Sequence, residues 1–257
     1  MKTAEEQAPI DSALTDPALI KNTQSLEMLR VQDLHAFYGE SHILHGVNFN
    51  VKRGELVTLL GRNGAGRSTT LKAIMNMVGR RTGSIVINGN ETLAMKPHHI
   101  PRLGIGYCPE ERGIFASLDV HENLLLPPTV SSGGMSLDEI YAMFPNLYER
   151  RKSQGTRLSG GEQQMLAMAR ILRTGARMLL LDEITEGLAP VIVQKLAEVL
   201  IQLKARGMTI VLVEQNFRFA APLADRHFVM DHGQIVEEIT AAQLPSRREH
   251  LNSMLGV

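Results

Sequence analysis

The residues best suited to chemistry in this 257-residue sequence form the run GRNGAGRST. Its glycines permit a tight path on which backbone N–H groups converge on an anion, and a helix that begins there adds its dipole. Phosphate is the natural guest of such a loop. The pattern G-x-x-x-x-G-K-[ST] is complete except that Arg67 stands where the lysine belongs. The residues expected to bind nucleotide phosphates are Gly61, Arg62, Asn63, Gly64, Ala65, Gly66, Arg67, Ser68 and Thr69.

Two carboxylates follow an apolar run much later in the chain, in MLLLDE. The apolar run is typical of a buried strand, and a buried charge is costly unless something pairs with it. A parallel strand ends at the same sheet edge as the phosphate loop, so Asp182 is expected to hold Mg²⁺ together with the Ser68 hydroxyl. Glu183 then lies where a water could attack the γ-phosphate, which makes it the candidate general base. The alternative is an acidic pair that caps the next helix.

Glycines also mark the start of another helix, in LSGGEQQ. Ser159 and Glu162 have the S-x-x-E spacing of a capping box, which by itself is a structural feature. A plain cap does not require Gly160 and Gly161, because a glycine weakens a helix by about 1 kcal/mol relative to alanine. Two glycines in a first turn indicate that a second anion approaches exposed N–H groups there.

The strands and helices that must position these motifs can be read from apolar periodicity. Residues 56–60 are typical of a strand covered on both faces, and apolar side chains then recur with helical spacing from Leu71 to Val78. Alternation around residues 29–31, 47–51 and 85–87 indicates antiparallel strands beside this core. Over about residues 112–175, prolines and short helical pieces replace the strand rhythm, which predicts an inserted helical subdomain.

Helices and strands alternate in the last third of the chain. We expect helices over residues 160–174 and 190–206, strands over 178–182 and 208–213, a final hairpin and a short closing helix. Such alternation implies a parallel sheet with crossover helices. The predicted fold over residues 26–257 is therefore α/β, a P-loop NTPase core with a mostly parallel sheet, an antiparallel β subdomain and the helical subdomain. Residues 1–25 are polar and interrupted by prolines, so a disordered extension is expected.

Composition limits the functional classes. Lys+Arg and Asp+Glu both number 27, so net charge gives no support for a nucleic-acid partner. The single Cys108 excludes an internal disulfide and suits a reducing compartment. No apolar run approaches membrane-spanning length, so a cytoplasmic protein is expected, with membrane contact made through a partner. His42 and His45, like the pair at residues 98–99, are expected to be surface or packing histidines, because no carboxylate or thiol nearby in the sequence completes a metal site.

The ordered set of motifs resembles the ATP-binding cassette (ABC) ATPase family over about residues 28–257. A nearer likeness is to the ATP-binding subunits of branched-chain amino acid importers, in GRNGAGRST, GIGYCPEERGIF, LSGGEQQMLA, DEITEGLAP and VEQN. The resemblance implies a head-to-tail dimer with a second ABC ATPase chain. The segment of one chain that faces ATP on the phosphate loop of the other comprises Ser159, Gly160, Gly161 and Glu162. Integral membrane permeases and, indirectly, a periplasmic solute-binding protein are the other implied partners.

The resemblance also implies roles for individual residues of this sequence. Tyr38, in FYGESHIL, matches the aromatic that stacks on adenine, although a strand-end aromatic can equally be a packing residue. Glu110, in YCPEE, lies where the family usually has the glutamine that touches Mg²⁺ or the attacking water. A carboxylate there keeps an oxygen ligand while adding negative charge. The residues from Phe115 to Asn123 are then expected to line the groove that receives a coupling helix of the permease.

Four positions depart from the broad family pattern. Gln215, in VEQN, takes the catalytic place of the switch histidine, Ala189 that of an aspartate, and Ile184 that of a proline. Gln215 and Ala189 fit the branched-chain importer branch. Arg67 keeps the positive charge of the lysine, but its planar guanidinium is bulkier and not equivalent. A badly placed arginine would lower hydrolysis roughly tenfold to hundredfold, whereas a loop adapted to it would lose little.

We therefore expect an ATP-hydrolysing subunit of an ABC importer, located peripherally on the cytoplasmic face of the inner membrane. Charge on the reacting phosphate would be neutralised by Mg²⁺, Arg67 and the facing helix start. The cargo implied by the resemblance alone is branched-chain amino acids or related small amino acid or amide solutes. The alternative is a regulatory ABC module that binds ATP with little or no turnover. A soluble ABC protein of translation or DNA repair is disfavoured, because those usually carry two cassettes or a long coiled-coil insertion.

Overall fold

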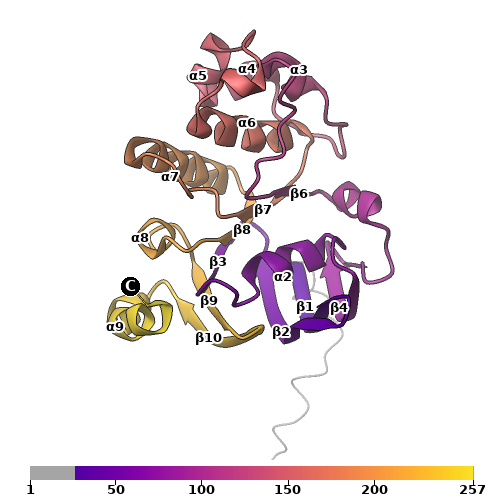
Figure 1. Ribbon diagram of the computed structural model, residues 1–257, viewed down its shortest axis with the longest axis vertical. Coiled ribbons are helices and arrows are strands. Elements are labelled where there is room, and N and C mark those ends of the chain that lie inside the picture. Colours follow the sequence, from indigo (N-terminus) through magenta and orange to yellow (C-terminus); the bar gives the residue numbers. More distant parts are fainter. Residues whose placement is uncertain (1–26, 257) are drawn as a thin grey trace, which may run out of the picture.

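A computed structural model describes residues 27–256, so the extension predicted over residues 1–25 lies outside the described residues (Figure 1). The first part of the chain forms an antiparallel sheet of four strands in the order β2-β1-β4-β5. These strands are β1 (Glu27–Tyr38), β2 (Ser41–Lys52), β4 (Arg80–Ile87) and β5 (Asn90–Glu91). Asn88 and Gly89 join the last two, with φ of 50° and 79°. Positive φ at both turn positions suits a tight hairpin, as the Asn-Gly pair predicts.

A second sheet of six strands, in the order β10-β9-β3-β8-β7-β6, carries the glycine loop. Its strands are β3 (Leu56–Gly61), β6 (Ile105–Cys108), β7 (Met178–Asp182), β8 (Thr209–Val213), β9 (Arg226–Asp231) and β10 (Gln234–Thr240). Only the β9–β10 pair is antiparallel, so the predicted mostly parallel sheet is confirmed. Val213 pairs with both Leu59 and Asp182. The ends of β3 and β7 therefore lie level at one edge.

The six-stranded sheet is covered on both faces, as the unbroken apolar runs predict. Leu56 and Leu60 of β3 belong to a hydrophobic core shared with the later helices. Val57 and Leu59, on the opposite face of the same strand, belong to a core shared with the antiparallel sheet and the helix after the glycine loop. Burial on both faces explains why β3, β7 and β8 contain no exposed position.

The helices occupy positions close to those predicted. They are α2 (Arg67–Ile74), α3 (Val120–Leu125), α4 (Leu137–Met143), α5 (Pro145–Glu149), α6 (Gly160–Arg173), α7 (Pro190–Ala205), α8 (Phe217–Ala220) and α9 (Leu244–Leu255), with 3-10 turns at Pro97–Leu103 and Gly155–Arg157. Helices α3 to α6 lie together at the end of the molecule opposite the antiparallel sheet (Figure 1). A separate helical subdomain bounded at residues 112–175 stays a prediction.

The helix after the glycine loop is shorter than its apolar pattern predicts. α2 ends at Ile74, whereas the spacing extends to Val78. Asn76 adopts the left-handed region with φ of 55°, which stops the helix and turns the chain towards β4. Val78 nevertheless packs against the same core as Leu71. The last apolar position of the pattern, Val78, therefore reflects packing against the core and not a helical conformation.

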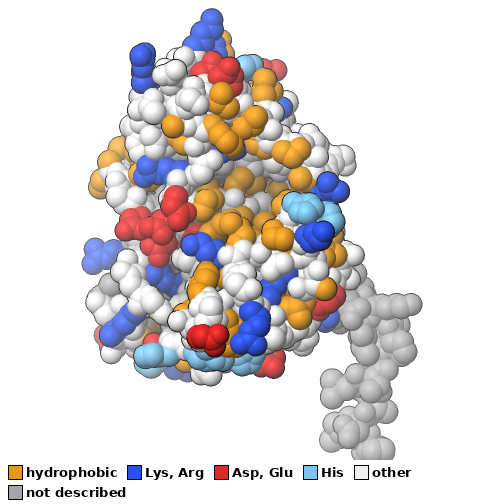
Figure 2. Space-filling model, turned by 45° about the vertical axis from the view of Figure 1, so that its right-hand side comes forward, with side chains coloured by type: hydrophobic (Ala, Val, Ile, Leu, Met, Phe, Trp, Pro, Cys, Tyr) orange, Lys and Arg blue, Asp and Glu red, His pale blue; other side chains and the backbone are white. Residues whose placement is uncertain are grey.

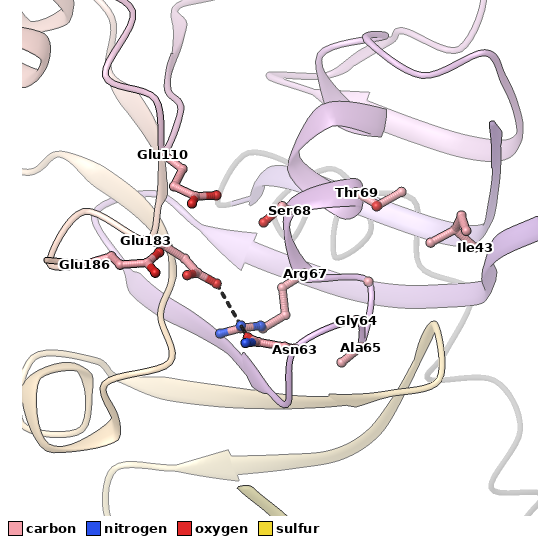
Figure 3. Close-up of a pocket in the computed structure, with 11 residues that line it drawn as sticks. Ile43, Asn63, Gly64, Ala65, Arg67, Ser68, Thr69, Glu110, Glu183 and Glu186 are labelled. Carbon is pink, nitrogen blue, oxygen red and sulfur yellow. Dashed lines mark hydrogen bonds and ion pairs between the residues drawn. The ribbon is translucent and has the colours of Figure 1, made fainter.

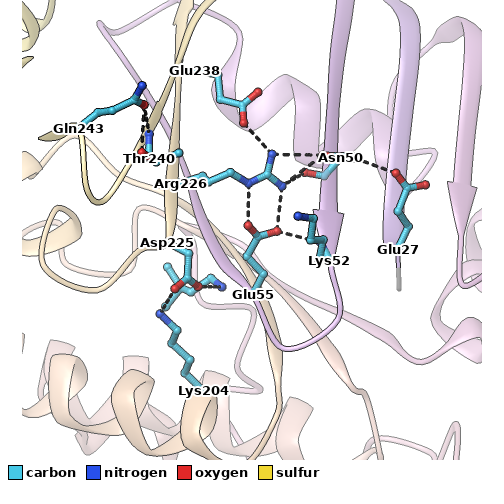
Figure 4. A network of polar contacts seen from close by, with 11 residues as sticks. Glu27, Asn50, Lys52, Glu55, Lys204, Asp225, Arg226, Glu238, Thr240 and Gln243 are labelled. Carbon is cyan, nitrogen blue, oxygen red and sulfur yellow. Dashed lines mark hydrogen bonds and ion pairs between the residues drawn. The ribbon is translucent and has the colours of Figure 1, made fainter. Parts of the chain in front are cut away.

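A largely buried arginine joins the two sheets (Figure 4). Arg226 of β9 donates from Nε and Nη2 to the carboxylate of Glu55, at 2.6 and 2.8 Å. Its Nη1 donates to Glu238 of β10 at 2.8 Å, and its Nη2 donates to the carbonyl of Asn50 of β2 at 2.8 Å. The Arg226 and Glu55 side chains are only 13% and 11% exposed. This pairing satisfies both charges where water has little access.

Candidate functional site

A cavity of about 420 Å³ lies at the edge of the sheet where β3 and β7 end (Figure 3). It gathers residues from the glycine loop, from β2 and from the segments after β6 and β7. The lining residues are Ile43, Asn63, Gly64, Ala65, Gly66, Arg67, Ser68, Thr69, Glu110, Glu183 and Glu186. The structure thus brings most of the predicted phosphate loop together with Glu110 and Glu183. Gly61 and Arg62 line a neighbouring cavity on the other side of the loop.

The loop requires glycine at its closest turns. Gly66 has a φ of 103°, and a Cβ atom there would lie 2.8 Å from the Leu44 side chain. A Cβ atom on Gly61 would lie 2.5 Å from the backbone oxygen of Met230. Gly66 is also the N-cap of α2, and it has no side chain to accept the first N–H groups of the helix. Those donors therefore face the cavity without a side-chain cap, as an anion site needs.

Asp182 and Ser68 meet at this edge as predicted. The Ser68 hydroxyl donates to Asp182 Oδ1 at 2.8 Å. The other carboxylate oxygen accepts from the hydroxyl of Tyr107 at 3.0 Å. Burial raises the pKa of Asp182, and these two hydrogen bonds act in the opposite direction. Tyr107 was not predicted, and its only sequence signal is a position on the strand next to β7.

The donors at this edge suit Mg²⁺. The ion is usually held by one or two carboxylates, with the remaining ligands supplied by phosphates and water. Asp182 supplies one carboxylate, Ser68 a hydroxyl, and Glu110 lines the same cavity. Within residues 27–256 no group of three or more His, Cys, Asp or Glu side chains is arranged to hold a metal ion alone. An ion that arrives with nucleotide fits this sparse set, and its assignment to Ser68, Asp182 and Glu110 stays a prediction.

Arg67 and Glu183 are bound to each other across the cavity. Arg67 Nη2 donates to Glu183 Oε1 at 2.7 Å and to Asn63 Oδ1 at 3.3 Å. The Arg67 side chain is 4% exposed, and its buried Nη1 has no hydrogen-bond partner in the described part of the chain. Burial raises the pKa of Glu183, and the Arg67 charge partly offsets this rise. Glu183 also has a φ of 47°, a backbone conformation that is uncommon outside glycine.

Two residues that the sequence did not predict complete the walls. Glu186 faces the cavity near Glu183 and Glu110, and it lies in the turn that follows β7 (Figure 3). Burial and the neighbouring charge of Glu186 raise the pKa of Glu110. Ile43 adds an apolar surface from β2. The acidic wall suits a cation, and the loop opposite suits an anion, so the cavity fits the two together.

The remaining predicted site residues lie outside this cavity. Tyr38 ends β1 with 41% of its surface exposed, and Gln215 is exposed just after β8. At the start of α6, Ser159 Oγ accepts from the N–H of Glu162, whose carboxylate accepts from the N–H of Ser159. The predicted capping box is therefore present. The roles predicted for these residues and for Gly160 and Gly161 stay predictions.

His35, His42 and Asp33 form a cluster across β1 and β2. The structure places His35 between His42 and Asp33, at 3.1 Å and 3.2 Å. Asp33 thus contacts His35 of β1, and His35 contacts His42 of β2 because the two strands are paired. The ring of His42 stacks on Phe37 with centroids 4.2 Å apart. Packing and mutual hydrogen bonds account for this cluster.

The structure has an apolar hollow, but it does not involve the segment from Phe115 to Asn123, where a groove was expected. Figure 2 shows hydrophobic side chains gathered in a hollow across the middle of the molecule. A cavity of about 780 Å³, mostly apolar, is lined by residues that include Ile105, Val130 and Ile171, and none from Phe115 to Asn123. Phe115 itself is exposed beneath the guanidinium of Arg170. The coupling-helix groove at those residues stays a prediction.

A second buried carboxylate fixes the segment that carries the candidate base. Glu214 follows β8 and accepts hydrogen bonds from the N–H and the hydroxyl of Thr185, at 3.0 and 2.9 Å. Burial raises its pKa to about 7, although these hydrogen bonds favour the charged form. Glu183 lies two residues before Thr185 in this segment. Glu214 thus connects the ends of β7 and β8 beside the cavity.

The raised pKa of Glu214 predicts a pH-dependent stability. The folded state favours the protonated acid, so its contribution is complete below the ordinary glutamate pKa and is lost as pH rises through about 7. Glu214→Gln removes this titration. From about pH 5 to about pH 8, the free energy of unfolding of the variant should rise relative to wild type by at most roughly 3 kcal/mol. Urea unfolding across this range measures the difference, and parallel pH curves for the two proteins would contradict the prediction.

A buried strand, a glycine loop and a helix start that face a strand-end carboxylate define a phosphate-loop nucleotide-binding protein of the α/β class. The family model described as ABC transporter matches residues 44–186. The chain belongs to the ABC transporter family. This membership confirms the resemblance, the predicted fold class and the expected ATPase activity.

Relatives and solved structures agree with the family. The high-affinity branched-chain amino acid transport ATP-binding protein BraG of Pseudomonas aeruginosa is 39% identical, over 89% of this chain and 100% of that protein. A probable branched-chain amino acid transport ATP-binding protein, LivF of Archaeoglobus fulgidus, is 36% identical, over 90% and 99%. A solved ATP-binding subunit of an ABC transporter is 28% identical with a TM-score of 0.74, over 90% of this chain and 100% of that chain.

One solved structure shows a related cassette with its products. It is a dimeric ATP-binding cassette in a post-hydrolysis state with ADP and phosphate, 25% identical with a TM-score of 0.73, over 83% of this chain and 99% of that chain.

Within residues 27–256 of the present chain, no helix is both long and apolar enough to cross a membrane.

Proposed function

We propose that this protein is the ATP-hydrolysing subunit of an ABC importer for branched-chain amino acids or related small amino acid or amide solutes. The observation that carries the chemistry is the cavity in which the phosphate loop, the Ser68–Asp182 pair and Glu183 meet. The cargo rests on the two relatives named for branched-chain amino acid transport. A regulatory module with little turnover has no support from these relatives.

In the proposed reaction, water attacks the γ-phosphate of ATP and the bond to the β-phosphate oxygen breaks. Glu183 takes the proton of the water, and ADP and inorganic phosphate leave. The loop N–H groups and Arg67 hold the phosphate oxygens, where they stabilise the developing negative charge. Bound Mg²⁺, held by Ser68 and Asp182 with Glu110 nearby, would supply further charge neutralisation.

The proposed working unit is a dimer of ATPase chains on two membrane permeases. In it, the start of α6 of one chain, at Ser159 to Glu162, closes over nucleotide held by the loop of the other. Tyr38 would contact the adenine, and Gln215 would take the switch position near the γ-phosphate. The ATPase would then lie on the cytoplasmic face of the membrane, with a solute-binding protein delivering cargo on the opposite side.

The test is reconstitution of the purified protein with its cognate permeases, in proteoliposomes that contain ATP and Mg²⁺. We expect phosphate release that increases when solute-binding protein and leucine are added outside, together with leucine uptake. Tight ATP binding without steady-state phosphate release would instead favour the regulatory module. Hydrolysis stimulated by a chemically unrelated solute, but not by leucine or small amides, would reject the proposed cargo while leaving the ATPase in place.

A further inference from the structure

Two groups on which the proposed reaction depends are bonded to each other in the structure. Arg67, which would hold the phosphates, donates to Glu183, which would take the proton of water, at 2.7 Å. Both side chains line the cavity and face each other across it (Figure 3). The positive charge of Arg67 acts to lower the pKa of Glu183, which makes the paired carboxylate a weaker base towards a water molecule. The ion pair therefore opposes proton uptake by the candidate base.

The surroundings keep this pair in place. The side chains of Arg67 and Glu183 are largely buried, and separating them without another partner would leave two poorly solvated charges. The backbone of Glu183 is fixed by its N–H, which donates to the Val213 carbonyl at 2.9 Å. Arg67 is fixed as the first residue of α2. Neither partner can leave by moving its main chain freely.

The Arg67 guanidinium nevertheless has a donor with which it can bind another anion. Its Nη2 is shared between Glu183 and Asn63, whereas the buried Nη1 has no partner among the described residues. Unpartnered buried donors are costly, so an anion that enters the cavity gains from satisfying Nη1. A phosphate carries more charge and more acceptor oxygens than a carboxylate, and it can engage both nitrogens of the planar fork. It therefore competes with Glu183 for the same guanidinium.

We propose that Arg67 and Glu183 form a latch that the terminal phosphate of a nucleoside triphosphate opens. The phosphate takes the guanidinium, and Glu183 is released towards the water that it activates. The base thus becomes available only when its substrate is bound, and part of the binding energy of ATP is used to separate the pair. A diphosphate lacks the group that opens the latch. This inference rests on the proposed function, because it assumes that the loop binds ATP.

The test measures nucleotide affinity and nucleotide-free stability rather than turnover. Glu183→Gln weakens the latch while keeping the side-chain shape, and Glu186→Gln removes a nearby carboxylate of the same cavity that is not bonded to Arg67. We expect Glu183→Gln to bind a non-hydrolysable ATP analogue about tenfold more tightly than wild type, the effect of one charge-assisted hydrogen bond. Its ADP affinity should stay within about twofold, since ADP lacks the opening phosphate. The same variant should melt at a lower temperature than wild type without nucleotide.

Glu186→Gln distinguishes the latch from a general charge effect. The proposal is supported if this variant gains distinctly less analogue affinity than Glu183→Gln. Equal gains in the two variants, or an equal gain for ADP and the analogue, would overturn the latch and leave the ATPase proposal standing. An unchanged melting temperature for nucleotide-free Glu183→Gln would also overturn it. If wild type bound neither nucleotide, both the latch and the proposed function would fail.

Discussion

Glu183→Gln is expected to lower the rate of ATP hydrolysis by roughly 10²- to 10⁴-fold, the range that positioned general bases contribute. Glutamine keeps the shape of the side chain and can still accept from Arg67, but it cannot take a proton from water. The loop glycines, Ser68 and Asp182 are untouched, so nucleotide should still bind. Steady-state phosphate release from the reconstituted transporter, with equilibrium nucleotide binding measured in parallel, gives both quantities.

The matched control is Glu198→Gln, the same chemical change on α7 at a surface pair with Lys195. Its hydrolysis rate should equal that of wild type, because this carboxylate lies on an exposed helix face outside the cavity. Hydrolysis and uptake by Glu183→Gln at the wild-type rate would show that another group takes the proton. A loss of nucleotide binding together with turnover would show that Glu183 acts in assembling the cavity.

Arg226→Met is expected to cost about 3–5 kcal/mol of the free energy of unfolding, the range found when one partner of a buried ion pair is removed. Glu55 would be left buried without its bidentate partner, and Glu238 and the Asn50 carbonyl would lose a donor. The side-chain contacts from Arg226 of β9 to β2 and β10 would be lost at the same time, whereas the backbone pairing of β9 with β10 would remain. Urea unfolding at fixed pH measures the change.

Two further variants distinguish the effect of breaking the Arg226–Glu55 ion pair from the effect of removing any arginine. Arg247→Met removes an exposed arginine 3.6 Å from Glu237, and its effect should stay within about 1 kcal/mol. The double variant Arg226→Met, Glu55→Gln should recover part of the lost stability, because it removes the uncompensated charge as well. A double variant less stable than the sum of the two single changes would contradict the role given to the ion pair.

The sequence was informative wherever one local pattern had one structural cause. The apolar run at residues 56–60 indicated a strand covered on both faces, and MLLLDE indicated a strand whose carboxylates reach the sheet edge. Since carboxyl ends of parallel strands share an edge, the contact between Ser68 and Asp182 followed from topology. The apolar pattern also misplaced the end of α2, because Val78 packs against the core, partly buried, without being helical.

The contacts that modify the chemistry could not be predicted in this way. Arg67 and Glu183 meet across 116 positions of sequence, and Arg226 reaches Glu55 across 171. Tyr107 contacts Asp182 only because β6 lies beside β7. Such pairs depend on the packing of side chains whose local sequence is compatible with many partners. The Arg67 substitution was visible in the sequence, but its partner was not.

The capping box at the start of α6 also determines what its serine can offer a ligand. Because Ser159 Oγ accepts the N–H of Glu162, one of the two lone pairs of this oxygen is used within the helix and the hydroxyl hydrogen is left to point elsewhere. An approaching phosphate would meet a donor rather than a nucleophile. Aspartate caps a helix about as well as serine does, but it has only acceptors to present. A serine hydroxyl at this position can therefore cap the start of a helix and still donate a hydrogen bond to an anion, two tasks that a carboxylate could not combine.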